Sequence, residues 1–189
     1  MLVVMALAVG LVDPLWALAP EPGGRLSAGI AVRPPPAHVA FCRAHPGACV
    51  ESAPETLSAD PATLVTLAAV NVAVNRAIAP RREPPGRDVW SLDASVGDCD
   101  EYAVQKRQTL VARGVPAGAL VLAVALTPQR ERHLVLVART QAGDLVLDNL
   151  TDAMLPVDRT GYRFLLMQNP TKPMGWAAVA TEDAGAAQS

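Results

Sequence analysis

Hydrophobic positions recur at helical spacing in the segment 58–80. Asp60 stands where a helix cap is expected, Pro61 suits the first helical turn, and Pro80 cannot continue a helix. One face of the predicted helix carries side chains three or four positions apart: Leu64, Leu67, Ala68, Asn71, Val74, Asn75 and Ile78. Two of these are amides, which need hydrogen-bond partners when buried, and we expect them to fix the loop that follows the helix.

A second helix is predicted to begin at Cys99 and to end before Gly114. Asp98 is a favourable N-cap residue, and Glu101 three positions later completes a capping box. The stretch 81–97, which joins the two helices, is rich in Pro, Gly and polar residues and is predicted to be a loop.

Beyond Gly114 the pattern changes to short runs rich in Val and Leu, separated by polar turns. These runs predict strands at 119–126, 133–139, 144–148 and 162–167. Helices followed by a sheet are typical of an α+β fold.

One predicted hairpin can be placed in register. If Thr140 to Gly143 form its turn, Val135 stands opposite Asp148. His133 then lies on the same face as Asp148, as a diagonal neighbour about 7–8 Å away at Cα. A carboxylate at that distance can reach an imidazole.

The two ends of the chain depart from this pattern. Residues 1–19 form an apolar run that ends in Ala17-Leu18-Ala19, which predicts a secretory signal peptide, although no basic residue precedes the run. The alternative is an apolar N-terminal strand or helix. The run is too short and too broken for a membrane-spanning helix, so we do not expect the protein to span a membrane.

The remaining boundaries follow from composition. Residues 20–38 are rich in Pro and Gly and are expected to form an extended or poorly ordered lead-in outside the core. The folded domain is predicted at 39–178, and the Ala-rich residues 179–189 are expected to form a flexible tail.

Overall composition limits the functions to consider. A chain of 189 residues, 51% of them apolar, suits a single domain. Its 16 basic and 18 acidic residues give a net charge of −2 without any basic run, which argues against binding to nucleic acid or to an anionic membrane surface.

The three cysteines divide into a close pair, Cys42 and Cys49, and a lone Cys99. In an exported chain the pair is expected to form a disulfide that closes a small loop, leaving one free thiol. A metal site of Cys42, His45 and Cys49 is an alternative, although its spacing fits no common zinc pattern. A third possibility is that Cys42 and Cys49 are both unpaired thiols.

Cys99 is the candidate nucleophile because a thiol at a helix N-terminus lies beside free backbone N–H groups and the positive end of the helix dipole. The N–H of Cys99 itself can stabilise an oxyanion. His38 and His45 lie in the Pro-rich and disulfide regions, so His133 is the expected general base, oriented by Asp148. Each residue alone also has an ordinary structural role, as a core thiol, a solvated imidazole or a turn residue.

The chain resembles the bacterial transglutaminase-like cysteine proteinases, the family of the periplasmic LapG-type proteases that release adhesins from the cell surface. The shared motifs are FCxxxPxxC at 41–49, VNxxVN at 70–75, DxW at 88–90, GDCDEYAxxK at 97–106, HLVLV at 133–137, LDNL at 147–150 and a closing Trp176. The resemblance implies a transglutaminase-like or papain-like core, with the nucleophile helix packed on an antiparallel sheet. It also implies a catalytic triad of Cys99, His133 and Asp148.

The same resemblance implies a calcium site formed by Asp98, Asp100 and Glu101 around the nucleophile. Simple helix capping by Asp98 and Glu101 is the alternative explanation of these acids. Trp90 of the DxW motif would either pack under the loop or donate its indole N–H to an oxyanion, and we expect packing.

The implied function is a periplasmic or secreted cysteine endopeptidase. Its partners would be a protein substrate, with a large surface adhesin as the candidate, and an inner-membrane regulatory receptor. Two alternatives stay open: transglutaminase-type acyl transfer by the same triad, and a non-catalytic domain that binds calcium or a partner protein.

Overall fold

The structure is a computed structural model that describes residues 23–53, 55–84 and 86–180. The predicted signal peptide, 1–19, lies outside the described residues, as does most of the predicted tail. No helix in the described ranges is long and apolar enough to cross a membrane.

Three α-helices occur in the described ranges: α1 Pro36–Ala44, α2 Pro61–Ala77 and α3 Cys99–Ala112. Three 3₁₀ turns accompany them: η2 Pro46–Ala48, η3 Ala117–Ala119 and η4 Val157–Arg159. The predicted caps are confirmed. The Asp60 carboxylate accepts from the Thr63 N–H at 2.9 Å, and Asp98 and Glu101 form a capping box on α3.

The main sheet has seven antiparallel strands in the order β1-β9-β8-β4-β5-β6-β7. Their bounds are β1 Ala28–Val32, β4 Leu120–Leu126, β5 Arg132–Thr140, β6 Gly143–Leu147, β7 Leu155–Pro156, β8 Arg163–Gln168 and β9 Trp176–Val179. A small parallel pair, β2 Ala79–Pro80 and β3 Val96–Gly97, leads into α3. The four predicted strands and the α+β order are confirmed, with strand ends within one residue of those expected.

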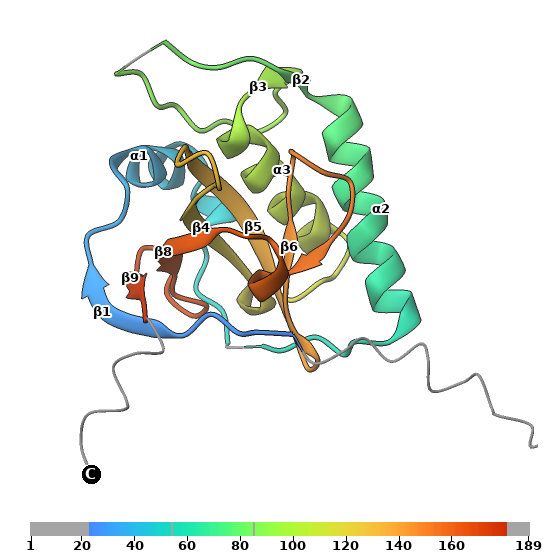
Figure 1. The fold of residues 1–189 in the computed structure, drawn as a ribbon. Coiled ribbons are helices and arrows are strands. Elements are labelled where there is room, and N and C mark those ends of the chain that lie inside the picture. Colours follow the sequence, from blue (N-terminus) through green and yellow to red (C-terminus); the bar gives the residue numbers. More distant parts are fainter. Residues whose placement is uncertain (1–22, 54, 85, 181–189) are drawn as a thin grey trace, which may run out of the picture.

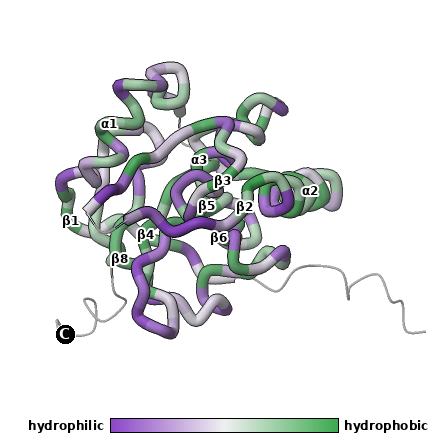
Figure 2. The backbone as a smooth tube through the Cα atoms, turned by 90° about the horizontal axis from the view of Figure 1, so that it is seen from above, coloured by the Kyte–Doolittle hydropathy of each residue, from purple (hydrophilic) through white to green (hydrophobic). Residues whose placement is uncertain are grey.

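Helix α3 packs on the sheet at β5, and α2 packs on α3 and reaches β6 (Figure 1). The α2 tube carries both hydrophobic and hydrophilic residues (Figure 2), and the residues that it buries are Leu67, Val70, Asn71 and Val74. The opposite sheet face carries a second apolar cluster that includes Val135 and Val137, and Leu26 and Val157 cover it. Both faces of the central strands are therefore buried.

The prediction that 20–38 lies outside the core is wrong for the part that the structure describes. Leu26 is buried, and its N–H donates to the Asp144 carboxylate at 2.9 Å. Strand β1 pairs with β9, and the Ala180 N–H donates to the Ser27 carbonyl, so the domain also extends past the predicted start of the tail at 179. Pairing of these distant segments gives their backbone groups hydrogen bonds that local composition does not reveal.

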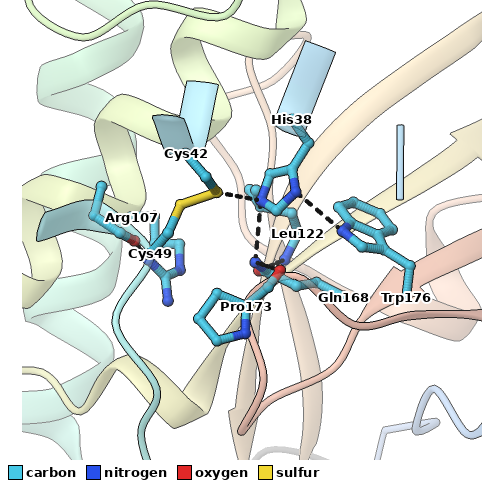
Figure 3. The surroundings of a disulfide bond; sticks show 9 residues. His38, Cys42, Cys49, Arg107, Leu122, Gln168, Pro173 and Trp176 are labelled. Carbon is cyan, nitrogen blue, oxygen red and sulfur yellow. Dashed lines mark hydrogen bonds between the residues drawn. A yellow bond between two sulfur atoms is a disulfide. The ribbon is translucent and has the colours of Figure 1, made fainter. Parts of the chain in front are cut away.

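The disulfide between Cys42 and Cys49 is present and joins α1 to the end of η2, which confirms that prediction (Figure 3). The histidine beside it is His38, not the His45 of the alternative metal site. His38 is buried, its Nδ1 accepts from the Trp176 indole N–H at 3.2 Å, and its ring packs edge-on against Trp90 and Trp176. This cluster ties α1 to the end of the sheet.

Candidate active site

Cys99 is the first residue of α3, and its thiol donates to the Asp100 carboxylate, with 3.7 Å between Sγ and Oδ1. The helix start is fixed by Glu101, whose carboxylate accepts from the Asp98 N–H at 3.0 Å. Gly97 permits this contact, because a Cβ there would lie 2.6 Å from Glu101 Oε2. The N–H of Cys99 takes part in no hydrogen bond among the described residues and stays free for a ligand.

His133 and Asp148 form a buried pair. The β5–β6 register pairs Leu136 with Leu147, and continuing it by one residue sets Val135 opposite Asp148, as predicted. His133 Nε2 lies 2.7 Å from Asp148 Oδ1. Asp148 cannot donate when ionised, so Nε2 carries the proton and Nδ1 is the free acceptor.

Asp148 is held as the anion. Although burial opposes ionisation, hydrogen bonds and charge from His133, together with bonds from Tyr162 and Leu150, lower the pKa of Asp148. The Leu150 N–H donates to Oδ1 at 3.0 Å, and the Tyr162 hydroxyl donates to Oδ2.

Tyr162 is a member of the site that the sequence reasoning missed. Its ring lies edge-on to the His133 ring, with 5.7 Å between centroids. Burial, followed by the hydrogen bond to Asp148 and the charge of that carboxylate, raises the pKa of Tyr162, so Tyr162 remains a hydroxyl donor. Its place at the start of the fourth predicted strand was the only sequence signal, and that position does not reveal contact with Asp148.

The segment 148–152 is fixed from α2. Asn75 Nδ2 donates to the Asp148 carbonyl at 2.9 Å and to Asp152 Oδ1 at 3.0 Å, and Asn71 Nδ2 donates to the Asp152 carbonyl at 3.1 Å. The two amides were expected to fix the loop directly after α2. They do fix a loop, but it is the one that begins with Asp148.

Cys99 and His133 line the same surface cleft, which has a volume of about 960 Å³. Its walls also include Trp90, Asp98 and Asp100. A substrate segment in this cleft would therefore meet the thiol from α3 and the imidazole from β5 together.

Of the three predicted metal ligands, the structure brings Asp98 and Asp100 together and directs Glu101 elsewhere. Ligand atoms of Asp98, Cys99 and Asp100 lie within 4.8 Å of one another. The Glu101 oxygens accept from the Asp98 N–H and the Ser91 hydroxyl. Asp88, which the sequence reasoning did not propose as a ligand, hydrogen-bonds to the Asp100 side chain.

This carboxylate cluster has unfavourable electrostatics of its own. Burial and then the charges of Asp88, Asp98 and Glu101 raise the pKa of Asp100 to about 8. Burial, followed by the charge of Asp100, also raises the pKa of the Cys99 thiol, although the Leu134 N–H opposes this. The thiol is therefore protonated while the cluster carries its negative charge.

Trp90 has the packing role that was expected. It is buried, and its indole N–H donates to Asp88 Oδ1 at 2.8 Å, so this N–H does not face an oxyanion.

Residues 28–184 match the sequence model of the family described as bacterial transglutaminase-like cysteine proteinase, BTLCP. The chain belongs to this family. It is thus a cysteine peptidase, and its sheet and nucleophile helix form the transglutaminase-like α+β core that the resemblance implied.

This BTLCP-family chain is similar to solved structures of LapG from Legionella pneumophila. It is 26% identical to the calcium-bound form, with a TM-score of 0.53 over 59% of this chain and 67% of that chain. To the EGTA-treated form it is 25% identical, with a TM-score of 0.52 over 59% of this chain and 66% of that chain. The match thus spans about two thirds of LapG. No curated protein matches the chain.

Proposed function

We propose that this proteinase hydrolyses a peptide bond of a protein substrate through a thioester on Cys99. The observation that carries the proposal is the His133–Asp148 pair at 2.7 Å, whose His133 lines the same cleft as Cys99. Cys99, His133 and Asp148 fit the roles of nucleophile, general base and orienting acid in covalent acyl transfer.

The chemistry follows from the two sides of the cleft. His133 Nδ1 takes the proton of the Cys99 thiol as the sulfur attacks the substrate carbonyl carbon, and it passes this proton to the departing amine. Water then attacks the thioester, His133 takes a proton from that water, and the Cys99 sulfur leaves and regains a proton. The free N–H of Cys99 is the donor placed for the oxyanion in both steps.

Asp148 orients the imidazole. Its bond to Nε2–H fixes the tautomer in which Nδ1 is unprotonated. Tyr162 and Asn75 hold Asp148 through its side chain and its carbonyl, respectively.

We also propose a calcium site at Asp88, Asp98 and Asp100. The donor chemistry fits, because carboxylate oxygens of Asp98 and Asp100 lie within 4.8 Å of each other and Asp88 hydrogen-bonds to the Asp100 side chain. Burial, and then the charges of the neighbouring carboxylates, raise the pKa of Asp100. A bound divalent cation would neutralise the carboxylates and so favour the Cys99 thiolate. The existence of calcium-bound and EGTA-treated structures of the similar LapG supports this proposal.

The substrate and location are further parts of the proposal. A periplasmic or secreted protein is supported by the disulfide, which persists in oxidising compartments. Resemblance to adhesin-releasing proteases supports a large surface adhesin as substrate and an inner-membrane receptor as regulator.

The deciding experiment is labelling of the oxidised protein with iodoacetamide at pH 6–7, with calcium or EGTA, followed by peptide mass analysis. We expect fast labelling confined to Cys99 in calcium, slow labelling in EGTA, and slow labelling of the His133→Gln variant in both. His45→Gln is the matched control and should behave as wild type. Labelling that is slow in calcium and insensitive to the His133 substitution would refute an activated nucleophile and favour a binding domain.

Hydrolysis and acyl transfer are separated by incubating a protein substrate with a labelled primary amine. New termini without amine incorporation support the peptidase. Amine incorporation without cleavage would replace it by the transglutaminase alternative. Cys99→Ser should abolish either activity without lowering Tm, because it exchanges one atom in a cleft wall.

A further inference from the structure

Lys106 is a fully buried cation close to the triad, and the proposed chemistry does not use it. It lies two turns after Cys99 on α3, and its side chain is 0% exposed. Its Nζ has no hydrogen-bond partner among the described residues and lies 5.8 Å from the centroid of the Tyr102 ring. Burying an unpaired ammonium is costly, so a site that retains one needs a physical reason.

The surroundings of Lys106 supply opposite charge and unused acceptors. Asp148 and Asp152, at the two ends of the segment 148–152, are the carboxylates whose charges act on it. Asn71 and Asn75 of α2 donate to that segment through their nitrogens, while their Oδ1 atoms are buried without a partner in the described part of the chain. One ammonium with three N–H donors and two amide oxygens thus remain unused where α2, α3 and this segment meet.

We propose that Lys106 is a positioning residue for the triad. Its ammonium is the internal counter-charge of Asp148 and is buried, like the unpartnered Oδ1 atoms of Asn71 and Asn75, where α2 and α3 meet the segment 148–152. Because Lys106 has no exposed surface, it cannot touch a substrate and acts only through Asp148 and His133.

The balance of charges gives the sign of the effect. Burial lowers the pKa of Lys106 to about 7, and the charges of Asp148 and Asp152 oppose that shift. By reciprocity the ammonium favours the ionised form of Asp148. The other titratable groups nearby are Tyr102, whose ring centroid lies 5.8 Å from Nζ, and His133, which hydrogen-bonds to Asp148. Removing the cation raises the pKa of every nearby acid, imidazolium included.

The test compares Lys106→Met, which is similar in length and has no charge, with Lys106→Arg, which keeps the charge. Arg107→Met is the matched control. Arg107 is the adjacent buried cation of the same helix, but it donates to the Ala48 and Leu120 carbonyls, away from Asp148. The measurements are kcat and KM against pH, Tm, and an NMR titration of the His133 ring assigned with His133→Gln.

For Lys106→Met we expect kcat to fall on the order of tenfold with KM nearly unchanged, because the substrate contacts remain. The acid limb of the rate profile should move to higher pH, and the pH dependence of the His133 NMR signal should move with it. Tm should not fall, because an apolar side chain replaces a buried charge. Lys106→Arg should keep the His133 titration at its wild-type position. Arg107→Met should lower Tm but also leave the His133 titration unchanged.

An unmoved His133 titration in folded Lys106→Met would overturn the proposal, as would a shift of equal size in Arg107→Met. The rate effect rests on the proposed peptidase function, but the NMR titration does not. A wild-type protein without hydrolytic activity would therefore count against the proposed function and leave the assignment of Lys106 to be decided by the titration.

Discussion

Acidification should destabilise this fold through His38, the histidine buried between Trp90 and Trp176. Burial, and then the charge of Arg107, lowers the pKa of His38 from 6.5 to about 4. The hydrogen bonds act in the same direction, because Nδ1 accepts from the Trp176 indole N–H, a group that can only donate. A proton on His38 Nδ1 would point at the Trp176 indole N–H, so two hydrogen-bond donors would face each other.

The sign and size follow from linkage. Between pH 6.5 and 4 the unfolded chain protonates this histidine and the folded chain does not, so stability is lost as pH falls. The shift from 6.5 to about 4 corresponds to a loss of about 2 kcal/mol by pH 5 and about 3 kcal/mol by pH 4. A loss of this size is a large fraction of the stability of an ordinary domain.

The assay is urea unfolding of the oxidised protein between pH 7 and pH 4, in parallel with His38→Gln. Carboxylates that titrate in this range contribute to both proteins and cancel in the difference. The stability advantage of wild type over His38→Gln should therefore shrink by about 2 kcal/mol between pH 7 and pH 5. His45→Gln, on the same segment but without the Trp176 bond, is the control. A wild-type advantage that stays constant with pH would refute the reasoning.

Two further changes test the contacts around the triad. Tyr162→Phe removes a donor to the Asp148 carboxylate, so the acid limb of kcat/KM should move to higher pH and the rate should fall about tenfold. Tyr102→Phe is the control: it loses a hydrogen bond to the Ile78 carbonyl instead and should not move the acid limb. Calcium at about a hundred times its dissociation constant should add about 2.7 kcal/mol and raise Tm by several degrees, and Asp88→Asn should reduce that rise if Asp88 is a ligand.

Local signals predicted the centre of this fold well. Asp60 and Asp98 cap their helices through their own side chains and the next few backbone N–H groups, so sequence spacing is enough to find them. The β5–β6 hairpin has a two-residue connection, which fixes its register. Sequence spacing alone was therefore enough to place His133 beside Asp148.

Contacts between distant segments could not be predicted in this way. Strand β1 pairs with β9 about 150 residues later in the chain, and β1 itself has no alternating pattern because most of it is exposed. Tyr162 and Asp88 reach the site only through such long-range packing. Lys106 occupies a position in α3 whose burial depends on how α2 and the segment 148–152 close over it.

Helix capping accounts for only part of the acidic cluster. Asp98 and Glu101 are needed at the start of α3, since each accepts from a backbone N–H there. Asp88 and Asp100 accept from no backbone N–H among the described residues, yet they hydrogen-bond to each other's side chain. Neighbouring carboxylates without a capping role are costly unless a proton or a cation neutralises them.

This division of roles predicts opposite effects with and without calcium. Asp100 is the first of the charged groups that raise the pKa of the Cys99 thiol, and its own pKa is raised to about 8. Asp100→Asn should therefore speed Cys99 labelling in EGTA relative to wild type when the labelling is carried out above pH 8, where Asp100 is ionised. The same variant should lose most of its response to calcium, because one of three oxygen donors is weakened. Asp93→Asn, an exposed acid of the preceding loop, is the control. If Asp100→Asn labels in EGTA no faster than wild type, the negative charge of Asp100 does not hold the nucleophile in its protonated form.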